Sequence, residues 1–587
     1  MAISDAERQI LEDIPLDDAW ALVETFSTMH RWDPEDVNRG ADVIIERART
    51  LGLPVEVHEA EIFLSVPHEA SVTIGDQEFR AKPPSLSLPV PEGRTAKALY
   101  IKANAENLRT YSRDARDVFG ESFTGWTDFK ERVAGKILIT EGFGNPALTS
   151  LVEDMGAAGL IVINPGANIH WGTSSMVWGS PGLDDLARKP KIPVVAVNKP
   201  DGAAIRASAE AGDDVTLKTR LVEGWFRQKI PVVHIAAEGP GAEIEGERFV
   251  LAHGHYDSWD VGVGDNATGN AALLGIAAGL WKNRSKLRRS VRIAWWPGHS
   301  TGRYSGSTWY ADNFALDLDR NCVATVNCDS PGCRWATVYN KLTCMTEMHE
   351  FITETLKDAT GKSPVFIRPK RAGDASFFNI GISSYFSLSS TMPKELLEEK
   401  GYYEVSGCGG NIAWHTEDDT MEIADRTNLK TDIDLYALAL LRHATKAVLP
   451  ADWRATLDEY RSTLAGYKEA AGDLIDWSDA DRATDALGAA LTAFYRAIAE
   501  RTIADEAANT VLIRLARLLV PLNYTRTLRF AQDPAVVCPM LPGMAIAQGM
   551  DLESDDAKHA AVDVRRGVNR YAACLGEAVE LVEGALS

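Results

Sequence analysis

The sequence predicts an α/β fold with a mainly parallel, mixed sheet between layers of helices. From about residue 230, apolar strand-like runs alternate with helical segments, an order typical of parallel sheets. Earlier, a proline-rich stretch interrupts the pattern, and after residue 450 the composition shifts to Ala, Leu, Arg and Asp at helical spacing. We therefore expect three parts: an α/β domain (1–95 and 230–450), a β-rich insert (96–229) and a C-terminal helical domain (451–587).

The N-terminal part contains a helix followed by a strand. In WDPEDVNRGADVIIERARTLGL, residues 32–53, apolar side chains recur at helical spacing, and Gly52 is placed to end the helix. The next text, VEVHEAEIFLSV, alternates as a strand does. Between residues 80 and 100, AKPPSLSLPVPEG holds too many prolines for a helix or a central strand, so it predicts a boundary.

The predicted insert repeats the order strand, turn and helix. GKILITEGF is read as a strand, NPALTSLVEDMGAAG as a helix, LIVINPG as a buried strand, and IPVVAVNKPDGAAIRA repeats the unit. This block, about residues 100–225, resembles the protease-associated domain, an insert found in several peptidase families. The resemblance implies that the insert shapes or covers a site without supplying its chemistry.

The central and C-terminal parts follow the same logic. The runs VVHIAAEG, RFVLAHG, SVRIAWW and VATVNCD predict strands, and NAALLGIAAGLW predicts a helix between them. In such sheets the reactive groups gather at the carboxyl ends of the strands. Near the C-terminus, apolar residues follow a helix cap expected at Ser478 and predict a core or interface stripe. They are Leu487, Leu491, Phe494 and Ile498.

Composition and charge restrict the possible functions. Hydrophobic residues make up 45% and charged residues 25% of the 587 positions, as in soluble globular proteins of more than one domain. The formal net charge of -22 repels polyphosphate and anionic lipid, so neither nucleic acid nor a membrane is expected as a partner. The acidic N-terminus, the lack of a long apolar run and seven cysteines without a CxxC pair predict a cytoplasmic protein.

Three polar motifs stand at the ends of predicted strands. LAHGHYDSWDVGVGDNATG places His255, Asp257 and Asp265 on a glycine-rich loop. VNCDSPG places Asp329 after an apolar strand, and WHTEDDT places His415 in an acidic turn. Imidazole and carboxylate together suit zinc or a similar first-row ion. Asp257 could orient a metal ligand without binding the metal itself.

Taken in order, HYDS, DNATG, NCDS and WHTEDDT resemble the zinc aminopeptidase and glutamate carboxypeptidase family, which also carries a protease-associated insert. RAGDASFFNIGI, residues 371–382, is similar to that family's G-x-D followed by Phe and Gly-Ile. The resemblance implies that His255 and Asp329 hold one metal, that His415 holds a second, and that Asp265 bridges them. It implies one or two divalent ions, zinc first, and a short peptide or small-molecule substrate.

The stretch WWPGHSTGRYSGS, residues 295–307, departs from that family. Aligned without gaps, His299 falls on the glutamate that serves as general base, and Ser300 falls on the glutamate that binds the second metal. Imidazole, with an unperturbed pKa near 6.5, could accept a proton from an activated water or bind the metal itself, whereas serine is a poor zinc ligand. We expect one complete metal site, a weak or altered second one, and His299 and Asp257 as the catalytic groups.

Three functions remain open from the sequence. The first is a metal-dependent hydrolase of a peptide, amide or related bond, with His299 as an atypical base. The second is a lyase, hydratase or isomerase on the same scaffold, which thiolates at Cys328, Cys333 and Cys408 would favour by binding iron, unless these are buried, inert thiols. The third is a non-catalytic relative that keeps only the fold.

Two further features bear on substrate and assembly. Several tryptophans near the motif loops predict either an aromatic-walled pocket or ordinary packing. They are Trp259, Trp295, Trp296, Trp309 and Trp414. The Lys-Tyr pair of glutamate-specific relatives is missing from GMAIAQGMD, so an acidic peptide is not expected. LNYTRTLRFAQDPAVVCPMLP loosely resembles the family's dimerisation domain and predicts a homodimer.

Overall fold

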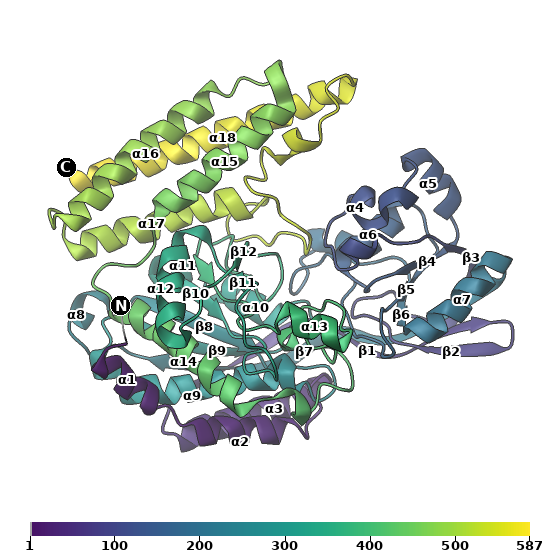
Figure 1. Cartoon of the computed structure of the whole chain (residues 1–587), viewed down its shortest axis with the longest axis horizontal. Coiled ribbons are helices and arrows are strands. Elements are labelled where there is room, and N and C mark those ends of the chain that lie inside the picture. Colours follow the sequence, from purple (N-terminus) through teal and green to yellow (C-terminus); the bar gives the residue numbers. More distant parts are fainter. Residues whose placement is uncertain (1–2) are drawn as a thin grey trace.

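Eleven strands form one continuous sheet in the computed structural model, which describes residues 3–587 (Figure 1). At its centre, β8 (Phe249–His255) lies between β9 (Ser290–Trp296) and β10 (Cys322–Asn327), and β13 (Ser384–Tyr385) follows β10; all of these pairs are parallel. On the other side of β9, β7 (Asp214–Ile235) runs antiparallel. The predicted mainly parallel, mixed α/β sheet is therefore confirmed.

Helices cover both faces of this central sheet. Successive side chains of β8 enter different apolar cores, because neighbouring residues of a strand point to opposite faces: Val250 packs with one helix layer and Leu251 with the other. The first layer contains α1 (Asp5–Glu12), α2 (Leu16–Phe26), α3 (Pro34–Thr50), α9 (Thr268–Lys282), α12 (His349–Thr360) and α14 (Arg426–Thr445). The second contains α10 (Ser305–Asn313) and α11 (Ala315–Asn321).

The insert continues the same sheet outward. Here β3 (Val90–Tyr100), β4 (Ile137–Glu141), β5 (Gly159–Ile163) and β6 (Val194–Val197) are parallel neighbours with two apolar cores of their own. Its helices are α4 (Ala115–Phe119), α5 (Trp126–Val133), α6 (Pro146–Asp154) and α7 (Lys199–Ala211). The proline-rich segment has no strand between β2 (Gln77–Ala81) and the start of β3, as its prolines require.

Two long strands join the insert to the central sheet. β1 (Val55–Ile74) pairs antiparallel with β7 from Val55 opposite Val233 to Thr73 opposite Thr216. β7 therefore runs through the boundary predicted at residues 229–230, whereas β1 ends before the one predicted at residue 95, and the two parts share one ribbon of backbone hydrogen bonds. Figure 1 shows this ribbon extending from the central sheet to the insert on the right.

Four long helices make up the C-terminal region. They are α15 (Trp453–Ala471), α16 (Ser478–Ala499), α17 (Asp505–Tyr524) and α18 (Asp555–Leu586). The predicted stripe of α16 is buried at Leu487, Leu491 and Phe494. Ser478 is not the helix cap: it is the first helical residue, and Asp476 Oδ1 accepts its backbone N–H at 2.9 Å. Asp476, and not Ser478, therefore accepts a hydrogen bond from a backbone amide at the start of this helix.

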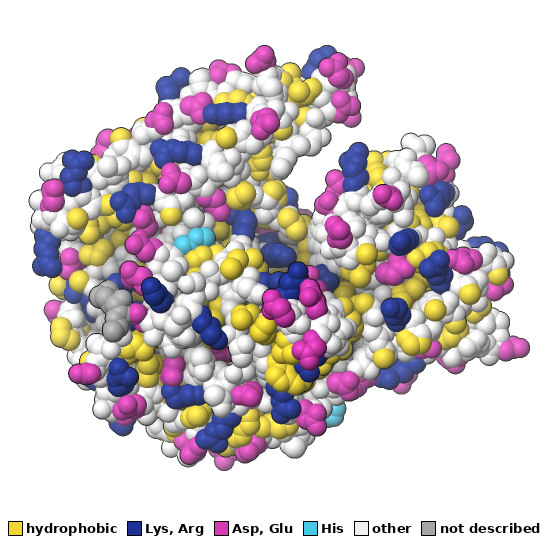
Figure 2. All heavy atoms as spheres, viewed as in Figure 1, with side chains coloured by type: hydrophobic (Ala, Val, Ile, Leu, Met, Phe, Trp, Pro, Cys, Tyr) yellow, Lys and Arg dark blue, Asp and Glu magenta, His cyan; other side chains and the backbone are white. Residues whose placement is uncertain are grey.

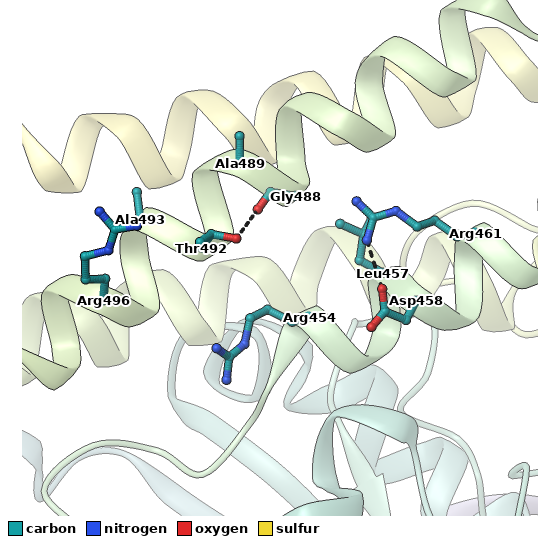
Figure 3. A pocket seen from close by; sticks show the side chains of 9 residues that line it. All are labelled: Arg454, Leu457, Asp458, Arg461, Gly488, Ala489, Thr492, Ala493 and Arg496. Atoms are coloured by element: carbon teal, nitrogen blue, oxygen red, sulfur yellow. Dashed lines mark hydrogen bonds and ion pairs between the residues drawn. The ribbon is translucent and has the colours of Figure 1, made fainter.

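A recess and a shallow groove are among the hollows of the surface (Figure 2). A recess separates the C-terminal helices from the insert, and basic side chains are visible on its inner wall (Figure 2). A second, shallow groove of about 560 Å³ lies between α15 and α16, where Arg454, Arg461 and Arg496 stand around small side chains (Figure 3). The remaining α-helices and strands are short: α8 (Ala242–Glu245), α13 (Lys394–Lys400), β11 (Leu342–Thr343) and β12 (Phe366–Ile367). Within residues 3–587, no helix has both the length and the apolar character that crossing a bilayer requires.

The buried His443 on α14 predicts a loss of stability in acid. Its ring stacks on Tyr385, and burial, with Arg289 and Lys446 nearby, lowers its pKa to about 3. Because the unfolded chain binds this proton near pH 6.5 and the folded chain does not, the free energy of unfolding falls as pH drops from 6.5 toward 3. We expect His443→Gln to reduce that loss by about 1 kcal/mol between pH 7.0 and 5.5, measured by urea unfolding at these two pH values. An identical pH slope in both proteins contradicts this role.

Candidate metal centre

The carboxyl ends of three parallel strands position the candidate site. His255 is the last residue of β8, His299 follows the end of β9, and Asp329 follows the end of β10. Asp265 lies on the glycine-rich loop before α9, and His415 lies on the loop before α14. Strand ends of a parallel sheet meet at one edge, so residues up to 160 positions apart in sequence share one small volume.

Asp265 lies between two imidazoles. Its Oδ1 is 3.0 Å from His255 Nε2, and its Oδ2 is 3.1 Å from His415 Nε2. Asp329 Oδ2 approaches the same His255 nitrogen to 3.8 Å. His255 Nε2 is buried and makes no hydrogen bond of proper geometry with the described residues, which leaves it free to bind a cation. This donor set of imidazole nitrogens and carboxylate oxygens fits a divalent ion such as zinc.

Backbone carbonyls fix the orientation of both rings. His255 Nδ1–H donates to the carbonyl of Asp257 at 2.8 Å, and His415 Nδ1–H donates to the carbonyl of Trp171 at 3.0 Å. Each ring therefore turns its Nε2 toward Asp265. Such a partner on the second ring nitrogen is usual for metal-binding histidines, because it sets the tautomer.

The buried charges strongly affect one another. Burial alone would lower the pKa of His255, but Asp265, Asp329 and Asp257 raise it to about 10. Burial and the neighbouring Asp265 raise the pKa of Asp329 to about 6. The carboxylates thus repel each other while the imidazole attracts a proton, and a bound divalent cation would satisfy both.

His299 is held by a second acidic group. Its Nδ1 is 2.6 Å from Asp374 Oδ2, and Ser307 Oγ donates to the other carboxylate oxygen of Asp374 at 2.7 Å. The His299 ring stacks on His255 with centroids 3.8 Å apart. Ligand atoms of His255, His299 and Asp329 all lie within 4.8 Å of one another, so these three side chains are close enough to hold one cation together.

Asp257 and Ser300 have structural contacts. The Asp257 carboxylate accepts the backbone N–H groups of His299 and Ser300, both at 3.1 Å. Asp257 thus positions the loop that carries His299, whereas the sequence interpretation placed it among the catalytic groups. The Ser300 carbonyl accepts the Thr173 hydroxyl of the insert at 3.1 Å.

Three site residues were not identified from the sequence. Asp374 and Asp419 belong to quoted motifs but received no role, and Trp171 belongs to the insert. Asp419 accepts the backbone N–H groups of Gly264 at 2.7 Å and Asp265 at 2.9 Å, and burial raises its pKa to about 7. Trp171 donates its N–H to the His415 carbonyl at 2.9 Å in addition to accepting from the His415 ring. The insert therefore supplies part of the support for the second imidazole.

The aromatic wall differs from expectation. Trp259 stacks on Trp171 with centroids 5.1 Å apart, and Trp414 stacks on His415 at 3.6 Å. Placing Trp296 at the site was wrong: it is fully buried in the core beneath α10, with its ring 5.1 Å from Tyr310. Trp295 enters the opposite core, as strand alternation requires.

The cysteines near the ligand motifs are poorly suited to binding metal. Cys328, Cys333 and Cys408 are buried, unpaired thiols. Burial raises the pKa of each well above its usual value, which disfavours the thiolate that a metal requires. This supports the interpretation of inert thiols.

Comparisons with known proteins place this site in context. Residues 234–439 match the profile of peptidase family M28. A probable leucine aminopeptidase 2 of Arthroderma benhamiae is 29% identical over 230 residues, covering 36% of this chain and 42% of that protein. A probable glutamate carboxypeptidase of Zea mays is 24% identical over 347 residues, covering 49% and 46%. The chain thus spans less than half the length of these curated relatives.

Solved structures share the fold. A zinc aminopeptidase from Bacillus subtilis superposes with a TM-score of 0.53 at 19% identity, over 75% of this chain and 98% of that one. A peptidase M28 precursor from Shewanella amazonensis gives the same TM-score at 16% identity, over 76% and 97%. At these identities the likeness concerns the architecture alone.

Proposed function

We propose, from the premise that residues 234–439 belong to peptidase family M28, that this chain is a metal-dependent hydrolase of peptide bonds. The observation that carries the proposal is Asp265 between the Nε2 atoms of His255 and His415, with Asp329 beside them. Similarity to proteins named as leucine aminopeptidases and a glutamate carboxypeptidase supports the same reaction class.

Four residues would hold the metal. His255, Asp265, Asp329 and His415 offer nitrogen and oxygen donors of the kind that zinc prefers. A divalent ion held there would polarise the carbonyl of the scissile bond and lower the pKa of a water molecule. Ser300 adds no carboxylate, so the His415 side has fewer ligands than the His255 side.

His299 takes the place of a general base. Its Nδ1–H donates to Asp374, so the neutral ring keeps the lone pair of Nε2 for a proton from the attacking water. The same nitrogen can then return the proton to the leaving amine, while the Asp374 carboxylate stabilises the imidazolium in between. Asp257 and Tyr304 keep the ring in place, the first through the loop backbone and the second through an edge contact with centroids 4.7 Å apart.

The two other functions have weaker support. A soft-metal or iron enzyme would need thiolates, and the three nearby thiols are buried with raised pKa values. A non-catalytic relative would not need the His299–Asp374 pair beside four side chains that can bind a metal. Hydrolysis therefore fits the described residues best.

Metal removal tests this proposal directly. We expect the purified full chain to contain one to two zinc ions, to hydrolyse short peptides, to lose this activity with a chelator and to regain it with zinc. The measurement combines elemental analysis with mass-spectrometric detection of peptide cleavage. Restoration by iron alone would favour the lyase or isomerase alternative. A zinc-loaded chain that cleaves no peptide in a diverse mixture would contradict the proposed function.

A further inference from the structure

A buried lysine joins the insert to the loop that carries a candidate metal ligand. Lys82 directly follows β2, and its backbone N–H and C=O groups bond to Ala196 of β6, at 3.0 and 2.8 Å. Only 2% of its side chain is exposed. Its ammonium group donates to the Ile169 carbonyl at 2.8 Å and lies 2.9 Å from Glu417 Oε2. A buried charge needs such partners, so one ammonium group holds a segment of the insert and a loop of the central domain together.

The two partners of Lys82 lie next to the contact that orients His415. Ile169 comes two residues before Trp171, and Glu417 comes two residues after His415. The Trp171 carbonyl accepts the His415 Nδ1–H at 3.0 Å, and the Trp171 N–H donates to the His415 carbonyl at 2.9 Å. Lys82 therefore bridges the two segments that exchange these hydrogen bonds.

The ring of Trp171 is restrained as well as its backbone. Lys82 Nζ lies 4.6 Å from the ring centre, which is a cation–π contact. The indole N–H donates to Asp260 Oδ2 at 3.1 Å, and Trp259 stacks on the ring with centroids 5.1 Å apart. The carbonyl that orients His415 thus belongs to a residue held from several directions.

This support matters more for His415 than for the other imidazole. His255 donates its Nδ1–H to the carbonyl of Asp257, two residues further along the same loop, so its orientation is set locally. His415 depends on a carbonyl 244 positions away, in the insert. Ser300 adds no carboxylate on this side, which leaves Asp265 and His415 as the proposed ligands there. When ligands are few, the affinity for an ion depends strongly on each being held in position.

We propose that Lys82 is a positioning residue for His415, through which the insert sets how tightly the ion on the His415 side is held. This rests on the proposed function, in which that ion is the more weakly bound of two. The effect passes through Glu417, Ile169 and Trp171, because these are the groups that the ammonium contacts. Replacing groups that orient a metal-binding histidine typically weakens metal binding by about 10- to 100-fold.

Zinc titration of the metal-free full chain, in competition with a chelating dye, tests this role without turnover. We expect two binding steps in the unaltered chain, and the absence of the weaker step in His415→Ala identifies it. Lys82→Met should weaken that step by about 10- to 100-fold and leave the tighter step, on the His255 side, unchanged. Removing a positive charge would by itself tighten cation binding, so weakening reports lost positioning and not lost charge.

Hydrogen exchange gives a second measurement that needs no substitution. Coupling between two sites is reciprocal, so an ion on the His415 side should stabilise the contact of the insert with His415. The Trp171 amide, which donates to the His415 carbonyl, reports on that contact. In the unaltered chain, zinc at the weaker step should slow exchange in residues 166–173, measured by mass spectrometry. In Lys82→Met this response should shrink.

A matched lysine on the insert separates positioning from general stability. Lys189 Nζ lies 2.5 Å from Glu223 Oε2 and 5.2 Å from the Phe63 ring centre, so it makes the same two kinds of contact at another place. Lys189→Met should bind both ions as the unaltered chain does. Lys82→Arg, which keeps the charge and the donors, should retain more of the weaker step than Lys82→Met.

The outcomes distinguish this inference from the peptidase proposal. A weaker step unchanged or tightened in Lys82→Met, an equal loss at both steps, or zinc that leaves exchange of residues 166–173 unchanged overturns the role of Lys82. A single step in the unaltered chain also overturns it, while peptide hydrolysis with one ion still stands. Selective loss of the weaker step, in a chain that cleaves no peptide, supports the positioning role and contradicts the peptidase.

Discussion

Asp265→Asn is expected to release the metal and to lower kcat/KM by at least about 10³, or ~4 kcal/mol of transition-state stabilisation. Asp265 contacts both imidazoles, at 3.0 Å from His255 Nε2 and 3.1 Å from His415 Nε2. Asparagine keeps the shape but replaces one anionic oxygen with an NH₂ group, which donates hydrogen bonds and cannot bind a cation. One side of the centre then loses its ligand, and only Asp329 remains as a negatively charged group among the proposed ligands.

Metal content and peptidase rates, measured together, check this expectation. Asp432→Asn is a matched control, because Asp432 is also a buried aspartate, bonded by the Gly332 N–H at 2.7 Å and the Ser390 hydroxyl at 2.6 Å. It should lose stability but keep its metal. A metal content in Asp265→Asn equal to that of the unaltered chain would mean that the convergence of side chains around Asp265 has no role in cation binding.

His299→Ala is expected to lower kcat by about 10² to 10⁴, or ~3 to 5.5 kcal/mol, with metal still bound. The proposed metal ligands are all retained in this variant, so only the proton acceptor of the attacking water is lost. Added imidazole should restore part of the rate, since a small base can occupy the space left beside His255. The measurements are kcat with and without imidazole, and elemental analysis.

Asp374→Asn examines the support of His299. Asp374 positions the ring through Nδ1 at 2.6 Å and, in our proposal, does not touch the substrate. Its replacement should lower kcat more than it changes KM, alter the pH profile and show no rescue by imidazole.

Two outcomes would contradict the proposed role of His299. Full activity in His299→Ala excludes His299 as the base. Loss of metal in His299→Ala would instead make His299 a ligand.

The sequence predicted the residues whose positions depend on local pattern. The apolar runs of β8 and β10 end next to His255 and Asp329, and a parallel sheet brings such ends together whatever the separation in sequence. The alternation of strands and helices was similarly local, so the architecture followed from periodicity and from the order of the motifs.

The missed residues depend on contacts that leave no local signal. His299 meets Asp374 across 75 positions, Asp265 meets Asp419 across 154, and His415 meets Trp171 across 244. The sequence around Trp171 contains no pattern that predicts a backbone contact with His415, 244 positions away. Trp296 was misassigned because closeness in sequence to a site loop says nothing about which face of the strand a side chain occupies.

The paired strands β1 and β7 link the position of the insert to the orientation of His415, a candidate metal ligand. A paired ribbon bends less easily than a single-stranded tether, so the insert is poorly suited to swing as a free flap. Any tilt large enough to pull Trp171 from His415 would also release that imidazole from its fixed tautomer and direction. The position of the insert is therefore part of the geometry of the candidate metal centre, because the Trp171 carbonyl fixes the direction of the His415 ring.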